Sequence, residues 1–164
     1  MGQGSALHAG VATVFLVTSL GEASAQAPAD ACALMSRDEF QALTGKTEYT
    51  DPTGMPWGSG TVCGFGNGQI LLFTGEDSKG AFDQMLASFG QQDLPRSPVE
   101  GLGEGAFALF FDPENPYQDH GAFVVFGAGP PTVAVTVYAD EKEPAEAALP
   151  QAMAVAKAVA AKLQ

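Results

Sequence analysis

Cys32 and Cys63 are the only cysteines of the chain and offer its most informative chemistry. Their separation excludes a Cys-x-x-Cys redox pair, and too few histidines accompany them to complete a zinc site. In an oxidising compartment two cysteines are usually bonded to each other. We therefore expect a Cys32–Cys63 disulfide, with two buried thiols as the alternative.

The acidic segment 112–120 is the second place where side chains could do chemistry. His120 follows Asp119, but no Gly-x-Ser-x-Gly turn supplies a nucleophile, so a solvated histidine is the expectation. Asp112 and Glu114 offer oxygens to a cation, although their spacing does not match an EF-hand loop. A carboxylate-dependent hydrolase and a calcium-binding adhesion or structural module are therefore alternatives. We expect an exposed polar loop, with no catalytic residue, metal or cofactor.

The binding candidate is the stretch Met55-Pro56-Trp57-Gly58, which sets a large aromatic side chain in a glycine-rich segment. Tryptophan is enriched at the energetic centres of binding surfaces, and it also covers small cores. We take Trp57, Met55 and Tyr117 as candidate binding residues. Packing against the domain is the role we expect of Trp57, with binding as the alternative.

The first 25 residues read as an export signal rather than as part of the fold. A short apolar run at 9–20 is followed by Ala23-Ser24-Ala25, a small-x-small cleavage site. The run is shorter than the roughly 20 residues that span a bilayer, and no Lys or Arg precedes it. We expect a cleaved signal peptide at 1–25, with an uncleaved anchor as the alternative, and one extracytoplasmic domain at 26–164, periplasmic or secreted.

The net charge of the chain limits the classes of partner that we expect it to bind. The chain has 19 acidic and 7 basic residues, a net charge of −12. Nucleic-acid binding and docking on anionic lipid both depend on basic side chains, so neither is expected. We expect an acidic protein, free of the membrane once cleaved, that is a monomer and meets an unknown small molecule or protein.

Local signals predict the elements that position these residues. Ser36 and Glu39 form a capping box at the start of a helix within 34–45, and Gly45 suits its end. A second helix is expected over 78–90, with Phe82, Met85, Leu86 and Phe89 as its buried stripe. The remaining expected elements are strands at 61–65, 69–74, 106–111, 121–126 and 132–138, and a helix at 144–163.

The order of these elements predicts the fold class. Residues 46–60 are turn-rich, and Gly66-Asn67-Gly68 predicts a hairpin between the first two strands. Pro150 should mark the first turn of the last helix or kink it. We expect a two-layer α+β fold, with three helices on one face of a mainly antiparallel sheet of about five strands.

A family resemblance covers most of the region after the signal. The pattern Cys32-x-Leu34-x-Ser36-x-x-Glu39-Phe40-x-x-Leu43-x-Gly45, then Cys63-x-Phe65 and Gly101-Leu102-Gly103-x-x-Ala106-Phe107, resembles a broad group of small exported bacterial proteins and lipoproteins of unknown function. Some are similar to extracellular sensor domains of bacterial serine/threonine kinases. The resemblance implies a Cys32–Cys63 disulfide, a helix-on-sheet fold and a non-enzymatic binding or sensing role. This chain lacks the lipobox of the lipoproteins.

Overall fold

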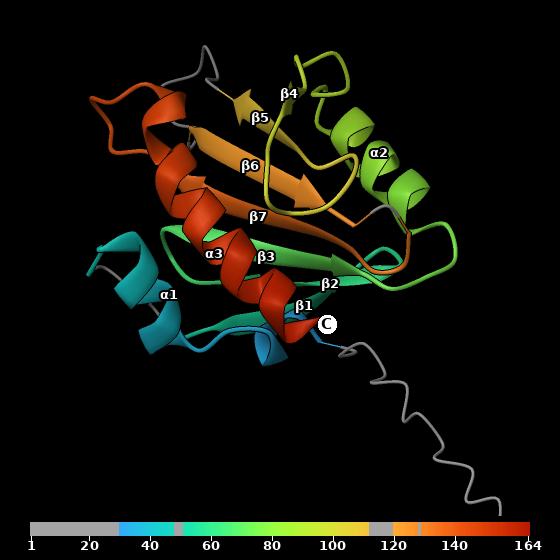
Figure 1. Ribbon diagram of the computed structural model, residues 1–164, viewed down its shortest axis with the longest axis horizontal. Coiled ribbons are helices and arrows are strands. Elements are labelled where there is room, and N and C mark those ends of the chain that lie inside the picture. Colours follow the sequence, from blue (N-terminus) through green and yellow to red (C-terminus); the bar gives the residue numbers. More distant parts are fainter. Residues whose placement is uncertain (1–29, 48–50, 112–119, 128) are drawn as a thin grey trace, which may run out of the picture.

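The structure, a computed structural model, describes residues 30–47, 51–111, 120–127 and 129–164. These residues form an α+β fold (Figure 1). The strands are β1 Thr53–Trp57, β2 Gly60–Gly64, β3 Gly68–Phe73, β4 Ser97–Pro98, β5 Phe107–Phe111, β6 Gly121–Phe126 and β7 Thr132–Tyr138. The helices are α1 Arg37–Thr44, α2 Ser78–Ser88 and α3 Leu149–Lys162, and two short 3₁₀ segments are η1 Ala31–Ala33 and η2 Ala145–Ala148.

Within the described residues, one antiparallel sheet holds seven strands in the order β1-β2-β3-β7-β6-β5-β4. The five predicted strands are all present, and β2 and β3 pair as the predicted hairpin. The count of five is wrong because β1 and β4 add one strand at each edge. Each edge strand contains a proline, Pro56 or Pro98, which lacks the backbone N–H that a further strand would need.

Both faces of the central strands β3, β7 and β6 are buried, so the expected two-layer arrangement is wrong. Along β3, Ile70 and Leu72 enter one cluster of buried side chains, and Leu71 and Phe73 enter another on the opposite face. We call them the first core and the second core. Residues of α3 and Phe40 of α1 pack into the first core. Figure 1 shows α3 lying across this face of the sheet. Helix α2 packs into the second core through Phe82, Met85 and Leu86.

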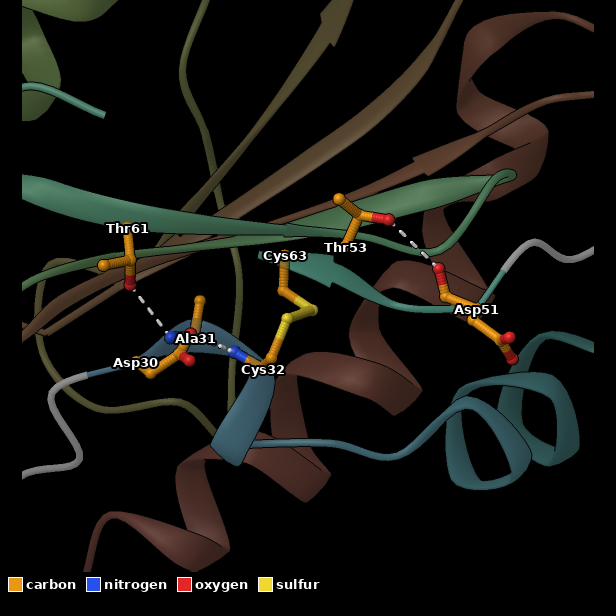
Figure 2. Close-up of a disulfide and its surroundings, with 7 residues drawn as sticks. All are labelled: Asp30, Ala31, Cys32, Asp51, Thr53, Thr61 and Cys63. Atoms are coloured by element: carbon orange, nitrogen blue, oxygen red, sulfur yellow. Dashed lines mark hydrogen bonds between the residues drawn. A yellow bond between two sulfur atoms is a disulfide. The ribbon is translucent and has the colours of Figure 1, made fainter. Parts of the chain in front are cut away.

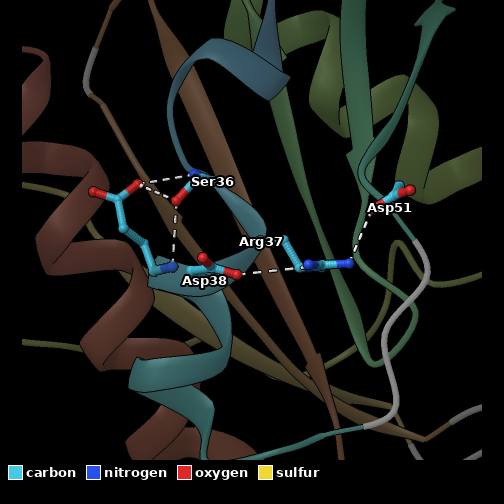
Figure 3. A network of polar contacts seen from close by, with 5 residues as sticks. Ser36, Arg37, Asp38 and Asp51 are labelled. Atoms are coloured by element: carbon cyan, nitrogen blue, oxygen red, sulfur yellow. Dashed lines mark hydrogen bonds and ion pairs between the residues drawn. The ribbon is translucent and has the colours of Figure 1, made fainter.

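Helix α1 begins and ends as its sequence predicts. The Ser36 hydroxyl accepts a hydrogen bond from the Glu39 N–H, and the Glu39 carboxylate accepts from the Ser36 N–H. Gly45 ends the helix with φ of 70°, in the left-handed region that glycine adopts without strain. Arg37, in the first turn, pairs with the neighbouring Asp38 and with Asp51 (Figure 3). These contacts are local or exposed, so α1 depends mainly on its buried face for stability.

The C-terminal helical region consists of two segments, η2 followed directly by α3. Pro150 lies in the first turn of α3, where its missing N–H has no partner to lose. At the other end, the Lys162 ammonium donates to both oxygens of Glu39, at 2.8 and 2.9 Å. This ion pair connects the C-terminal turn of α3 to the N-terminal turn of α1.

Stability should therefore respond to acid through Glu39. Its hydrogen bonds with Lys162 and Ser36 lower the pKa of the carboxyl from 4.5 to about 2. The folded state favours the carboxylate, so its stabilising effect is complete above pH 4.5 and is lost as pH falls toward about 2. Glu39→Gln should lose less stability than wild type on acidification through this window. Melting curves from neutral pH to about pH 2 measure it.

Glu104→Gln is the matched control, since Glu104 is exposed and has no hydrogen bond or ion pair among the described residues. Its melting temperature should follow wild type at each pH. Equal acid sensitivity of Glu39→Gln and wild type would contradict the role of this carboxylate.

Candidate binding site

The disulfide fixes the part of the sheet that carries Trp57. Cys32 and Cys63 are bonded, with Cα atoms 5.0 Å apart, and join η1 to β2 (Figure 2). The Ala31 N–H donates to the Thr61 hydroxyl at 2.9 Å, beside the bond. A Cβ placed on Gly54 of β1 would lie 3.2 Å from the Cys32 sulfur, so β1 packs directly against the disulfide. The predicted pairing is confirmed, and it braces the hairpin of β1 and β2.

That hairpin presents Met55 and Trp57 to one side of the sheet. Met55 pairs in register with Val62, a residue of the second core, and Trp57 pairs with Gly60 across the turn at Gly58–Ser59. Because side chains alternate along a strand, Met55 and Trp57 both lie on the second-core face. They remain exposed, at 48% and 38%. Trp57 is therefore partly exposed at the edge of the second core rather than buried within it.

Phe89 is the residue that the sequence did not assign to this site. It was expected in the buried stripe of α2, and that expectation is wrong, since Phe89 is 56% exposed and caps the end of the helix. Its ring stacks near the Trp57 ring, with centroids 5.9 Å apart and planes at 24°. The helical spacing of the apolar residues places Phe89 on the buried face only if the helix continues through it. Helix α2 ends at Ser88, so Phe89 stays exposed. Its position next to Gly90 was the available signal of a helix end.

A groove lies between the β1–β2 turn and α2. Its volume is about 400 Å³, within the roughly 300–1,000 Å³ typical of small-molecule sites. Its described lining residues are Trp57, Gly58, Ser59, Phe73, Ala81, Gln84, Met85 and Ser88. We call it the Trp57 groove. None of these residues carries an ionisable side chain, so the groove combines aromatic and aliphatic surface with neutral hydroxyl and amide groups.

A smaller hollow of about 150 Å³ adjoins the groove, and Trp57 and Met85 line both. Gln69, Phe89 and Phe123 are among its other lining residues. Between Gln69 and Phe123 in the sheet lies Thr136, which is fully buried. Its hydroxyl has no hydrogen-bond partner, the one such buried side-chain oxygen or nitrogen among the described residues. Trp57 thus stands between two hollows of the same face.

The charges of α2 lie away from the Trp57 groove. Asp83 forms ion pairs with Lys79 at 3.0 Å and Arg96 at 2.8 Å, and with Lys79 it lines a separate hollow beside Phe107 of β5. Burial opposes ionisation of Asp83, but hydrogen bonds from Lys79 and Arg96 outweigh it and hold the pKa of that carboxyl below its usual range. The helix therefore presents a neutral side to Trp57 and a charged side to β5.

The other predicted candidates are not brought to this groove. Tyr117 and the carboxylates Asp112, Glu114 and Asp119 fall outside the described residues, so the cation and hydrolase alternatives are untested at those positions. His120 is described, and its Nε2 lies 3.1 Å from the Asp140 carbonyl oxygen and 2.8 Å from that of Glu143. A carbonyl only accepts, so Nε2 carries the proton and joins the start of β6 to the 140–143 turn.

The described residues hold no group of three or more His, Cys, Asp or Glu side chains arranged to bind a metal ion. None of the helices in this part of the chain combines the length and the apolar character needed to cross a membrane.

Comparison of the chain with protein-family models, with curated proteins and with solved structures found no match.

Proposed function

We propose that this chain is an exported, non-enzymatic binding domain of the bacterial envelope or periplasm, and that its ligand or protein partner binds at the Trp57 groove. The observation that carries this proposal is the gathering of Met55, Trp57 and Phe89, all exposed, beside a groove of about 400 Å³. A contiguous group of large exposed apolar side chains marks a surface that another molecule can cover. A sensing role, as the resemblance implies, would use the same groove.

The extracytoplasmic location is part of the proposal. A Cys32–Cys63 disulfide is compatible with an oxidising compartment, and the small-x-small sequence at Ala23–Ala25 suits export. The prolines in both edge strands disfavour sheet-to-sheet association, which supports a monomer. The acidic net charge of −12 supports the expectation that nucleic acid is not the partner.

The test is a thermal-melting screen of the protein purified after expression of the full chain, against metals, metabolites and cell-wall fragments. A ligand at 100 times its dissociation constant stabilises by about 2.7 kcal/mol, which raises the melting temperature by several degrees. We expect at least one compound to do so with wild type. Trp57→Ala should melt without that rise, because the ring supplies the main contact surface.

Phe110→Ala is the matched control, because Phe110 is a partly buried aromatic of β5 that packs against the first core, on the opposite face. It should keep the ligand-induced rise. A compound that stabilises wild type and Trp57→Ala equally would place the binding site elsewhere and contradict the proposal.

A further inference from the structure

We propose that the Trp57 groove binds an uncharged saccharide, with a sugar ring stacked on Trp57. This inference rests on the proposed function and adds the chemical class of the ligand. A sugar ring has an apolar face of C–H groups and a rim of neutral hydroxyls. Recognition of such a ring needs an exposed aromatic face together with neutral hydrogen-bonding groups.

The aromatic face is present on the hairpin and at the end of α2. The Trp57 and Phe89 rings are nearly parallel, at 24°, and offset with centroids 5.9 Å apart. Rings this close leave no space for another ring between them, so a sugar would stack on the face of Trp57 turned away from Phe89. The faces of aromatic rings carry negative charge density, which attracts the polarised C–H groups of a sugar.

The neutral hydrogen-bonding groups come from both walls of the groove. Ser59 lies in the β1–β2 turn, and Gln84 and Ser88 lie on the facing side of α2. The Ser88 hydroxyl donates to the Met85 carbonyl oxygen at 2.7 Å, which leaves its oxygen able to accept from a ligand hydroxyl. The Gln84 amide offers both a donor and an acceptor, as the hydroxyls of a sugar require.

The same chemistry disfavours other classes of ligand. A phosphate, a nucleotide or an acidic polysaccharide would meet no Lys or Arg among the described lining residues, in a protein of net charge −12. A peptide that adds a strand at β1 would meet Pro56, which has no N–H to donate. An acyl chain would leave Ser59, Gln84 and Ser88 against hydrocarbon without partners.

Trp57 is the only tryptophan of the chain, so tryptophan fluorescence, excited selectively over tyrosine, reports on this site alone. The protein purified after expression of the full chain is titrated with linear, uncharged tetrasaccharides of β-1,4-N-acetylglucosamine, β-1,4-glucose and α-1,4-glucose. A trimer of galacturonic acid and an uncharged aromatic tetrapeptide serve as comparison probes. We expect one uncharged saccharide to change the fluorescence saturably, and the two comparison probes to leave it unchanged.

Variants locate the contact by calorimetric titration with that saccharide. Trp57→Ala should weaken binding by roughly tenfold or more, and Gln84→Ala by several-fold, as expected for loss of a stacking surface and of a neutral hydrogen bond. Phe110→Ala should bind as wild type does. Equal affinity in wild type, Trp57→Ala and Gln84→Ala would overturn the inference.

The remaining outcomes separate this inference from the proposed function. One outcome is that the peptide or the acidic trimer binds saturably and depends on Trp57, while no uncharged saccharide binds. This outcome overturns the saccharide assignment but still supports the Trp57 groove as a binding site. Absence of a Trp57-dependent signal with every saccharide and comparison probe overturns the saccharide assignment. If the melting screen also finds no Trp57-dependent compound, the proposed function falls with it.

Discussion

Removal of the disulfide by the double substitution Cys32→Ala and Cys63→Ala is expected to lower the free energy of unfolding by about 3–4 kcal/mol. The bond closes a loop with a sequence separation of 31, and its loss frees the unfolded chain from that constraint. A loss of this size should lower the melting temperature by roughly 10 °C. Alanine is preferred to serine because Cys63 is fully buried and a hydroxyl there would need a partner.

Urea unfolding of wild type and the double variant measures the effect, each with and without reductant. Reductant should destabilise wild type to about the level of the variant and leave the variant unchanged. The contrary result is a wild-type protein that unfolds at the same urea concentration with its disulfide intact and fully reduced. That result would contradict the bracing of η1 and the β1–β2 hairpin by the disulfide.

Phe40→Ala is the second substitution with a large expected effect, a loss of about 3–5 kcal/mol in the free energy of unfolding. Phe40 of α1 is fully buried, and its ring stacks on Phe65 with centroids 4.4 Å apart and planes at 1°. The Phe40 ring packs so closely on the start of β3 that a Cβ placed on Gly68 would lie 2.7 Å from the tip of the ring. Truncation therefore leaves a cavity between helix and sheet that rigid backbone cannot fill.

Phe89→Ala makes the same chemical change at an exposed site and is the matched control. Phe89 is 56% exposed, so its loss should cost less than about 1 kcal/mol. Equilibrium urea unfolding distinguishes the two variants. Comparable losses for Phe40→Ala and Phe89→Ala would contradict the assignment of Phe40 to the first core and Phe89 to the surface.

Local chemistry was sufficient to predict several elements. The capping box of Ser36 and Glu39 and the end of α1 at Gly45 depend on side chains and backbone within a few residues of each other. The β2–β3 hairpin follows from a glycine-rich turn between two apolar runs, and the Pro150 position follows from its missing N–H. These features have the same cause in an isolated segment and in the folded domain.

The two missed strands, β1 and β4, are strands because a neighbouring strand pairs with each of them. β1 reads as a turn because it contains Gly54 and Pro56, and it is a strand because β2 supplies its hydrogen-bonding partner. β4 has two residues, Ser97 and Pro98, and exists through its pairing with Ala108 and Phe107. Gly54, Pro56 and Pro98 disfavour a strand locally, and pairing with the neighbouring strand outweighs that preference.

The sequence contained a signal that the sheet is covered on both faces, which the two-layer prediction missed. Ile70-Leu71-Leu72-Phe73 is apolar without alternation, and a strand of this kind is buried on both sides. This run required a helix on each face, and α2 occupies the second one. The Trp57 groove follows from that placement, because it forms where α2 meets the β1–β2 turn. The candidate residues Trp57 and Met55 were identifiable by type, whereas Phe89 and the groove required the fold.

Nuclear magnetic resonance tests most directly whether Trp57 lies at the binding surface. The chain has one tryptophan, so its side-chain indole N–H gives one assignable signal. That signal is followed while a compound that stabilises the protein is added. We expect the indole signal and the amides of Ser59, Gln84 and Phe89 to shift most and to reach saturation together. Shifts concentrated on α3 and α1, with the indole signal unmoved at saturation, would contradict a binding surface at Trp57.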